Sequence, residues 1–146
     1  MSAVAKAAGV GQGSLYRHFP DRIELALAAF EDNVAELERL ASDPAVTLGE
    51  LLECITDRSI ESVAFIDMIA PTTDDERLTA VTDRVIQALA AKVQPAIERG
   101  EVASDTTAED LFLSVAMIAT LVARTPLEQR RQVADRAWSL VRKGLV

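Results

Sequence analysis

Apolar residues recur at intervals of three and four along most of this chain of 146 residues, which is the period of an α-helix with one buried face. The longest run contains Ile23, Leu27, Phe30, Val34, Leu37 and Ala41. No stretch of useful length alternates apolar and polar residues as a half-buried strand does, and no internal repeat is visible. Hydrophobic residues make up 49% of the chain, enough to bury a core. The sequence therefore predicts an all-α fold.

Three helix starts are marked by a polar capping residue that stands three positions before an acidic residue, as in a capping box. The pairs are Asp21 with Glu24, Thr47 with Glu50, and Thr107 with Asp110. The first pair opens the long apolar run, which predicts a helix of about 20 residues. The other two predict helices that begin near residues 47 and 107.

Proline and glycine predict where the helices end. The expected breaks are the segment Ser42–Pro44, Pro71, Gly100, Pro126 and Gly144. The helix that starts near Thr47 is expected to end close to Ile69 or Ala70. The next helical region begins in the acidic stretch 72–76, and Pro95 inside it predicts a kink or a boundary near Val93. Segments 108–124 and 127–143 are the expected last two helices.

The charge is distributed unevenly. The chain carries 15 basic and 23 acidic residues, a net charge of −8. The first 22 residues hold Lys6, Arg17 and Arg22 against Asp21 alone, so the remainder holds 12 basic and 22 acidic residues. A mildly basic head on an acidic body is the arrangement expected if only the head meets nucleic-acid phosphate.

Several classes of function find no support in the residues present. Cys54 is the single cysteine, which excludes an internal disulfide and a Cys/His zinc site, and it is expected to be a small apolar helix residue. The chain has no phosphate-binding glycine loop, no catalytic Cys/His arrangement and no metal-ligand spacing, so we expect no enzyme and no cofactor. No apolar run could span a membrane and no secretory signal is visible, so we expect a soluble protein of the cytoplasm.

The N-terminal residues predict two short helices joined by a tight turn, as in a helix-turn-helix. Residues 2–8 are Ala-rich, Gly9 permits a left-handed turn, and a second helix covers about residues 12–19 before Pro20. Small Ala5 and Ala8 would let the two helices cross closely. The apolar underside would be Val10, Leu15 and Phe19. Ordinary packing of a helical hairpin is the alternative on spacing alone.

This segment closely resembles the signature of the TetR (tetracycline-repressor) family of transcriptional regulators. The resemblance is carried by VAKAAGV at residues 4–10 and by Tyr16-Arg17-His18-Phe19 with the following Asp21 and Arg22. It implies that operator DNA meets Gln12, Gly13, Ser14, Tyr16, Arg17, His18 and Arg22. Gln12 suits adenine or phosphate, while the hydroxyl and imidazole groups suit phosphates. The alternatives are a core position for Tyr16, a packing or capping role for His18 and simple solvation for Arg17.

The resemblance begins in the middle of the family's pattern. A complete first helix and a Ser or Thr cap normally precede the motif, whereas Met1 falls within the second helix. We therefore expect a truncated helix-turn-helix, arising from an internal start or another truncation, and weakened DNA binding. A first region, residues 1–41, would combine this element with the connecting long helix, and residues 44–146 would form the regulatory domain.

The acidic body resembles the family's helical regulatory domain, which holds a small-molecule effector and forms a homodimer through its last two helices. The resemblance is looser there and rests on Arg99-Gly100-Glu101, Thr107–Leu111 and Trp138 to Leu145. The expected dimer contacts are Leu111, Val115, Ile118, Ala119, Ala134, Trp138 and Val141, with a position inside the chain's own core as the alternative for Trp138. The expected lining of an apolar effector pocket is Phe65, Met68, Ile69, Phe112 and Met117, with core packing as the alternative.

The predicted function is a one-component regulator, a repressor by expectation, that binds operator DNA as a homodimer and leaves it when a small apolar effector binds. The alternative is a helical dimer that binds a ligand or partner and does not bind DNA.

Overall fold

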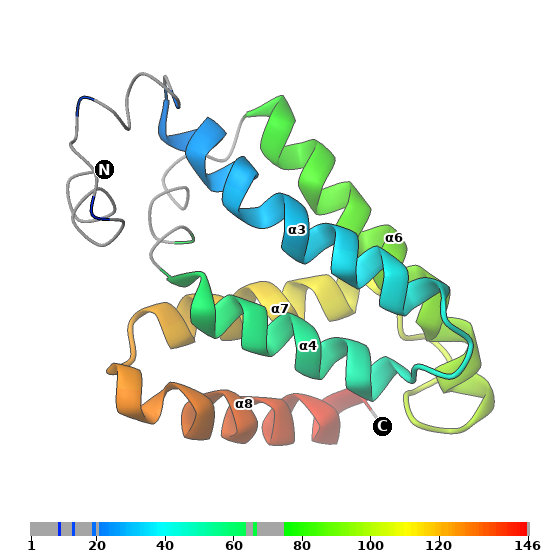
Figure 1. The fold of residues 1–146 in the computed structure, drawn as a ribbon. Helices are drawn as coiled ribbons and strands as arrows, with labels where there is room; N and C mark the ends of the chain where they lie inside the picture. The colour runs from blue at the N-terminus through cyan, green and yellow to red at the C-terminus, as the bar shows by residue number, and fades with distance from the viewer. Residues whose placement is uncertain are drawn as a thin grey trace.

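The computed structural model describes residues 9, 13, 19, 21–63, 66 and 75–145. These residues form five α-helices and one short 3-10 helix, and the described part contains no strand (Figure 1). The elements are α3 (Arg22–Ser42), α4 (Leu48–Glu61), α6 (Glu76–Glu98), α7 (Ala108–Ala123), η1 (Leu127–Gln129) and α8 (Arg130–Leu145). The all-α prediction is confirmed. No helix of the described part is long and apolar enough to cross a membrane.

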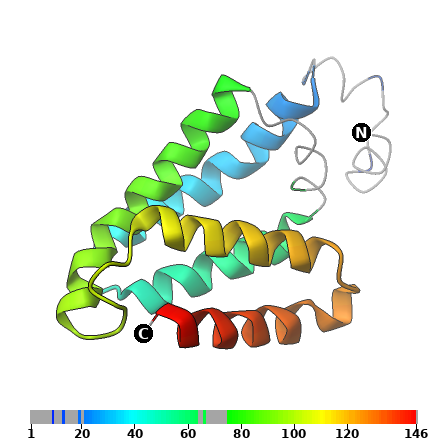
Figure 2. The same cartoon turned by 180° about the vertical axis from the view of Figure 1, so that it is seen from behind.

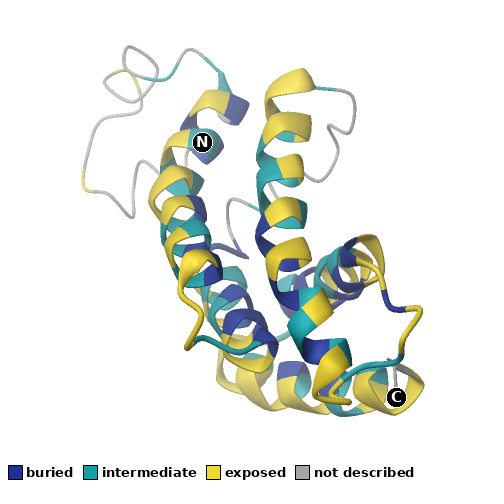
Figure 3. Cartoon of the chain, turned by 90° about the vertical axis from the view of Figure 1, so that its right-hand side faces the viewer, coloured by how far each residue is buried: buried dark blue, intermediate teal, exposed yellow. Residues whose placement is uncertain are grey.

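The helices pack around one core, with α3 and α6 as one closely packed pair and α4, α7 and α8 packed against one another. α3 and α6 lie side by side, and α7 contacts α4, α6 and α8 (Figures 1 and 2). The largest fully buried side chains come from three of these helices and are Leu51, Leu89, Leu111 and Val122. Buried positions face inward between the helices and exposed positions face outward, as Figure 3 shows. Burial of such apolar surface is the main favourable contribution to the folding of this body.

Local sequence explains the helix starts. Asp21 Oδ1 accepts a hydrogen bond from the Glu24 backbone N–H at 2.7 Å, so α3 begins where its cap predicts. Thr47 and Thr107 each form a reciprocal capping box with the acidic residue three positions later. Gly100 adopts φ 69° directly after α6, and Gly9 adopts φ 67°, so both predicted glycine turns are confirmed.

We expect Thr47→Ala to lower the free energy of unfolding by about 1 kcal/mol, because the substitution removes the hydroxyl that satisfies the Glu50 backbone N–H. Urea unfolding followed by circular dichroism measures the change. Thr79→Ala is the matched control, because Thr79 is an exposed residue within α6, where alanine is a better helix former. Equal losses in the two variants would contradict the capping argument.

Two expected helix ends were wrong. α4 ends at Glu61 rather than near Ile69 or Ala70, because Ser62 leaves the regular helix with φ −96° and ψ 12°. The Asn33 amide of α3 donates to the Ser62 hydroxyl at 3.3 Å, a tertiary contact that helps to hold this residue. The last helix does not stop at Gly144, since α8 continues to Leu145.

Pro95 does not set a helix boundary near Val93, because α6 continues to Glu98. A proline in the last turn removes only one N–H from the helix ladder. Its own carbonyl still accepts from the Arg99 N–H at 3.2 Å. The buried Ala96 that follows keeps this last turn in the core.

Candidate functional site

The described part of the N-terminal element is small. Gln12, Ser14, Tyr16, Arg17 and His18 lie outside the described residues. Gly13 is helical and exposed, and a Cβ added there would meet no atom within 4 Å. Arg22 begins α3, and its side chain also lies outside what the structure describes. The predicted roles of these residues toward DNA therefore stay predictions.

α3 follows the N-terminal motif directly and is joined to α6 by arginine–carboxylate contacts. Arg77 of α6 donates through both terminal nitrogens to Asp21 Oδ2, at 3.2 Å each, and so reaches the residue that caps α3. Arg84, two turns further along α6, makes a two-pronged contact with Glu38 at 2.7 and 2.9 Å. It also bonds Glu31 at 2.9 Å. These contacts hold α3 against α6 from its first turn to near its end.

A buried lysine completes this seam between α3 and α6. Lys92 of α6 is 5% exposed, and its ammonium donates to the Asp43 backbone carbonyl at 2.5 Å. Asp43 is the C-cap of α3, where the carbonyl end of the helix dipole favours a positive charge. On the other side of α3, Arg58 of α4 bonds Glu36 at 2.6 Å. Both neighbouring helices therefore fix the position of α3.

The ion pairs shift the titration of the carboxylates. The hydrogen bonds and charge of Arg84 lower the pKa of Glu38, although partial burial opposes the shift. The pKa of Asp21 is lowered chiefly by the hydrogen bond from the Glu24 backbone N–H, with Arg77 contributing further. Both carboxylates are thus held in the charged form that the seam requires.

Acid is expected to weaken this seam. Because the folded-state pKa of Glu38 lies below its unfolded value, its stabilising effect is present above the unfolded pKa and is lost as pH falls through the folded pKa. Glu38→Gln should therefore lower the urea midpoint at neutral pH, and its difference from the wild type should vanish once the pH has fallen below the lowered folded-state pKa of Glu38. The control is Glu128→Gln, which removes an exposed carboxylate that has no ion pair among the described residues. A Glu38→Gln effect that is constant with pH would contradict the role of this ion pair.

The expected effector-pocket residues fall into three groups. Phe65, Met68 and Ile69 lie outside the described residues. Phe112 is half-buried and packs against the core cluster. Met117 does not line the interior, because its side chain is 53% exposed on the outer face of α7. This position of Met117 corrects the expectation from sequence.

The residues expected at a dimer interface mostly lie inside the chain itself. Leu111, Ile118, Ala119, Ala134 and Trp138 are buried, whereas Val115 and Val141 are half-buried. The Trp138 indole N–H donates to Thr56 Oγ1 of α4 at 2.7 Å. The structure therefore supports the intrachain alternative for Trp138, since its side chain fastens α8 to α4.

A different face of α7 is apolar and exposed, and sequence reasoning missed it. Leu113, Met117 and Leu121 are 59%, 53% and 46% exposed. Their spacing of four residues aligns them in one stripe on the side of the helix away from the buried Leu111. Leu140 of α8 is also exposed. These residues form a second apolar period in the sequence of α7, but sequence alone could not show which of the two periods is buried.

Comparisons with known proteins agree with this reading of the fold and motif. A sequence model of the family described as bacterial regulatory proteins, tetR family, matches residues 1–29. The crystal structure of a TetR transcriptional regulator from Streptomyces coelicolor is similar, with a TM-score of 0.62 and 32% sequence identity over 97% of this chain and 84% of that chain. A search among curated proteins gives no match. This chain belongs to the TetR family of bacterial transcriptional regulators.

Proposed function

We propose that the chain represses transcription by binding operator DNA as a homodimer, and that a small-molecule effector releases it. The observation that carries the proposal is the way in which the N-terminal motif is connected to the rest of the chain. The family motif, residues 1–29, runs into α3, and carboxylates of α3 are bonded to arginines of α6. A change in the position of α6 would thus reach the DNA-reading element through α3.

The reading element would use Gln12, Gly13, Ser14, Tyr16, Arg17, His18 and Arg22. Gln12 is the candidate for contact with a base edge, since a glutamine amide can pair with adenine through two hydrogen bonds. The hydroxyl, imidazole and guanidinium groups would bind phosphates and set the register on the duplex. Because the rest of the chain is strongly acidic, the head alone would meet the DNA. The protein would act in the cytoplasm, where a bacterial chromosome is reached.

The homodimer would form through the outer stripe of α7, Leu113, Met117 and Leu121, with the exposed Leu140 of α8 contributing. An exposed apolar stripe of this kind is typical of an interaction surface. A two-fold axis would place the stripe of one protomer against that of the other. The two reading elements would then reach half-sites about one helical turn of DNA apart.

The effector would occupy an apolar cavity bordered by Phe65, Met68, Ile69 and Phe112. Apolar and methionine-rich linings suit small apolar molecules. Such an effector releases the DNA only if it binds one arrangement of α6 and α3 better than the other. The ion pairs of Arg77 with Asp21 and of Arg84 with Glu38 link the two helices, so a movement of α6 would carry α3 with it.

A gel-shift experiment on the chain's own promoter tests the proposal. We expect salt-sensitive, sequence-specific binding, with Gln12→Ala losing discrimination between promoter and scrambled DNA. Arg17→Gln should weaken both equally, as a phosphate contact would. Arg136→Gln, on an exposed position of α8, is the charge-matched control. Absence of specific binding would overturn the proposal and favour a helical dimer that does not bind DNA.

A further inference from the structure

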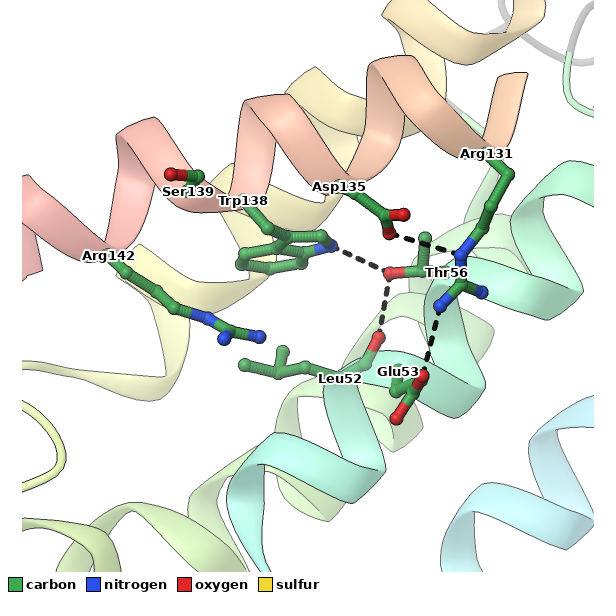
Figure 4. Close-up of a pocket in the computed structure, with 8 residues that line it drawn as sticks. All are labelled: Leu52, Glu53, Thr56, Arg131, Asp135, Trp138, Ser139 and Arg142. Atoms are coloured by element: carbon green, nitrogen blue, oxygen red, sulfur yellow. Dashed lines mark hydrogen bonds and ion pairs between the residues drawn. The ribbon is translucent and has the colours of Figure 1, made fainter. Parts of the chain in front are cut away.

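A hollow of about 460 Å³ lies between α4 and α8, in a part of the molecule that the proposed function does not use. Its size lies within the range of small-molecule sites. The lining residues are Leu52, Glu53, Thr56, Arg131, Asp135, Trp138, Ser139 and Arg142 (Figure 4). It therefore combines one large aromatic ring with two arginines and two carboxylates.

The apolar wall of this hollow is held in a fixed position. The Trp138 N–H donates to Thr56 Oγ1 at 2.7 Å, and the Thr56 hydroxyl donates to the Leu52 carbonyl at 2.7 Å. These bonds satisfy the polar edge of the indole inside the molecule. Trp138 and Leu52 are each only 6% exposed, so what they offer a bound molecule is a narrow apolar strip at the floor of the hollow.

The two arginines of the hollow differ in their partners. Arg131 is fully engaged, because it contacts Glu53 at 2.9 Å and Asp135 at 3.1 Å and also pairs with Asp57. Arg142, at the other end of the hollow, has no hydrogen bond or ion pair with any residue that the structure describes. Trp138 lies between the two arginines in Figure 4. One end of the hollow thus offers an uncommitted cation, and the other end presents carboxylates that are already paired.

We propose that this hollow binds a small monocarboxylate with an apolar body. The carboxylate would accept hydrogen bonds from the Arg142 guanidinium, whose planar fork matches its geometry. The apolar body would lie against Trp138 and Leu52. A second negative group at the far end would meet Glu53 and Asp135, so a dicarboxylate of the same length binds more weakly.

The site is independent of the surfaces that the proposed function requires. At about 100° per residue, Leu140 lies on roughly the opposite side of α8 from Asp135 and Arg142. The hollow shares no lining residue with the proposed effector cavity or the α7 stripe. A failure of DNA binding or dimer formation would therefore leave this proposal intact, and the reverse also holds.

Trp138 is the only tryptophan of the chain, so its fluorescence reports on the hollow directly. The probes are hexanoate, phenylacetate and cyclohexanecarboxylate, each titrated through the millimolar range into the full chain with excitation of tryptophan alone. The matched probes are hexanamide, which lacks the charge, and adipate, which adds a second carboxylate. We expect saturable binding of the monocarboxylates, with hexanamide weaker by about tenfold, as the loss of a charged hydrogen bond implies.

Two variants locate the binding. Arg142→Gln should weaken hexanoate by about tenfold, down to the affinity of hexanamide. Arg136→Gln removes the same charge from the other side of the same helix and should leave binding unchanged. Circular dichroism spectra of both variants check that each remains folded.

The proposal is overturned if none of the three monocarboxylates binds, or if hexanoate and hexanamide bind equally. Equal losses in Arg142→Gln and Arg136→Gln would also overturn it, since only a general effect of charge would then remain. Binding that neither variant changes would assign the ligand to another site and contradict the proposal. Adipate that binds as tightly as hexanoate would contradict the predicted selectivity at the acidic end.

Discussion

If the proposed homodimer forms through α7, Met117→Glu is expected to raise its dissociation constant by about 100-fold or more. Met117 lies in the middle of the exposed α7 stripe, between Leu113 and Leu121. In a two-fold interface every substitution occurs twice, so two carboxylates would be buried in apolar surroundings near each other. Binding to a two-half-site operator should then fall with the dimer, because each protomer would supply one of the two proposed reading elements.

Sedimentation velocity over a range of protein concentrations measures this dissociation. Met117→Leu is the conservative control, since it keeps the apolar volume and should keep the dimer. Ala90→Glu adds the same charge at an exposed position of α6 and should have little effect. A wild-type chain that sediments as a monomer, or a Met117→Glu variant that dimerises like wild type, would remove α7 as the interface.

The parts of the fold that the sequence predicts well are those fixed by neighbours along the chain. Capping pairs three residues apart and the glycine at the end of α6 act within one turn of helix, so their signals are complete in a short window. The end of α4 is different. Ser62 is bonded to Asn33, which lies 29 residues away, and no local pattern could reveal that contact.

For a related reason, the sequence pattern did not predict which face of α7 is exposed. This helix is apolar on nearly all sides, with Leu111 and Ile118 on one face and Leu113 and Met117 on another. Periodicity marks a buried face only when the opposite face is polar. The contacts with α4, α6 and α8 decide which leucines enter the core. The family motif identified the function class, whereas tertiary packing determined which surface was available for a partner.

The hollow between α4 and α8 shows the same limit on prediction from sequence. Arg131 meets Glu53 across 78 positions of the chain, and Trp138 meets Thr56 across 82. No pattern in the sequence indicates that these distant residues are partners. Only the packing of α8 on α4 leaves Arg142 without a carboxylate partner in the described part, while Arg131 at the other end of the hollow has three.

Leu111→Ala is expected to lower the free energy of unfolding by about 2 to 5 kcal/mol. Leu111 is fully buried in the core cluster, so truncation removes apolar contacts and leaves a cavity that the surrounding helices fill only in part. A loss of this size is a large share of the stability of a typical domain. The measurement is the urea midpoint at a fixed protomer concentration, because formation of the proposed dimer would itself contribute to stability.

Leu113→Ala provides the matched control, because the same truncation occurs two residues away on the exposed face of α7. Its effect on the unfolding of the protomer should be small, and its effect on the dissociation constant of the dimer should be the larger of the two. Leu111→Ala should instead change the free energy of unfolding more than the dissociation constant, and the fraction that remains folded should still form the dimer. If Leu111→Ala dissociates the dimer without lowering stability, Leu111 belongs to the interface and the assignment of the two faces of α7 is inverted.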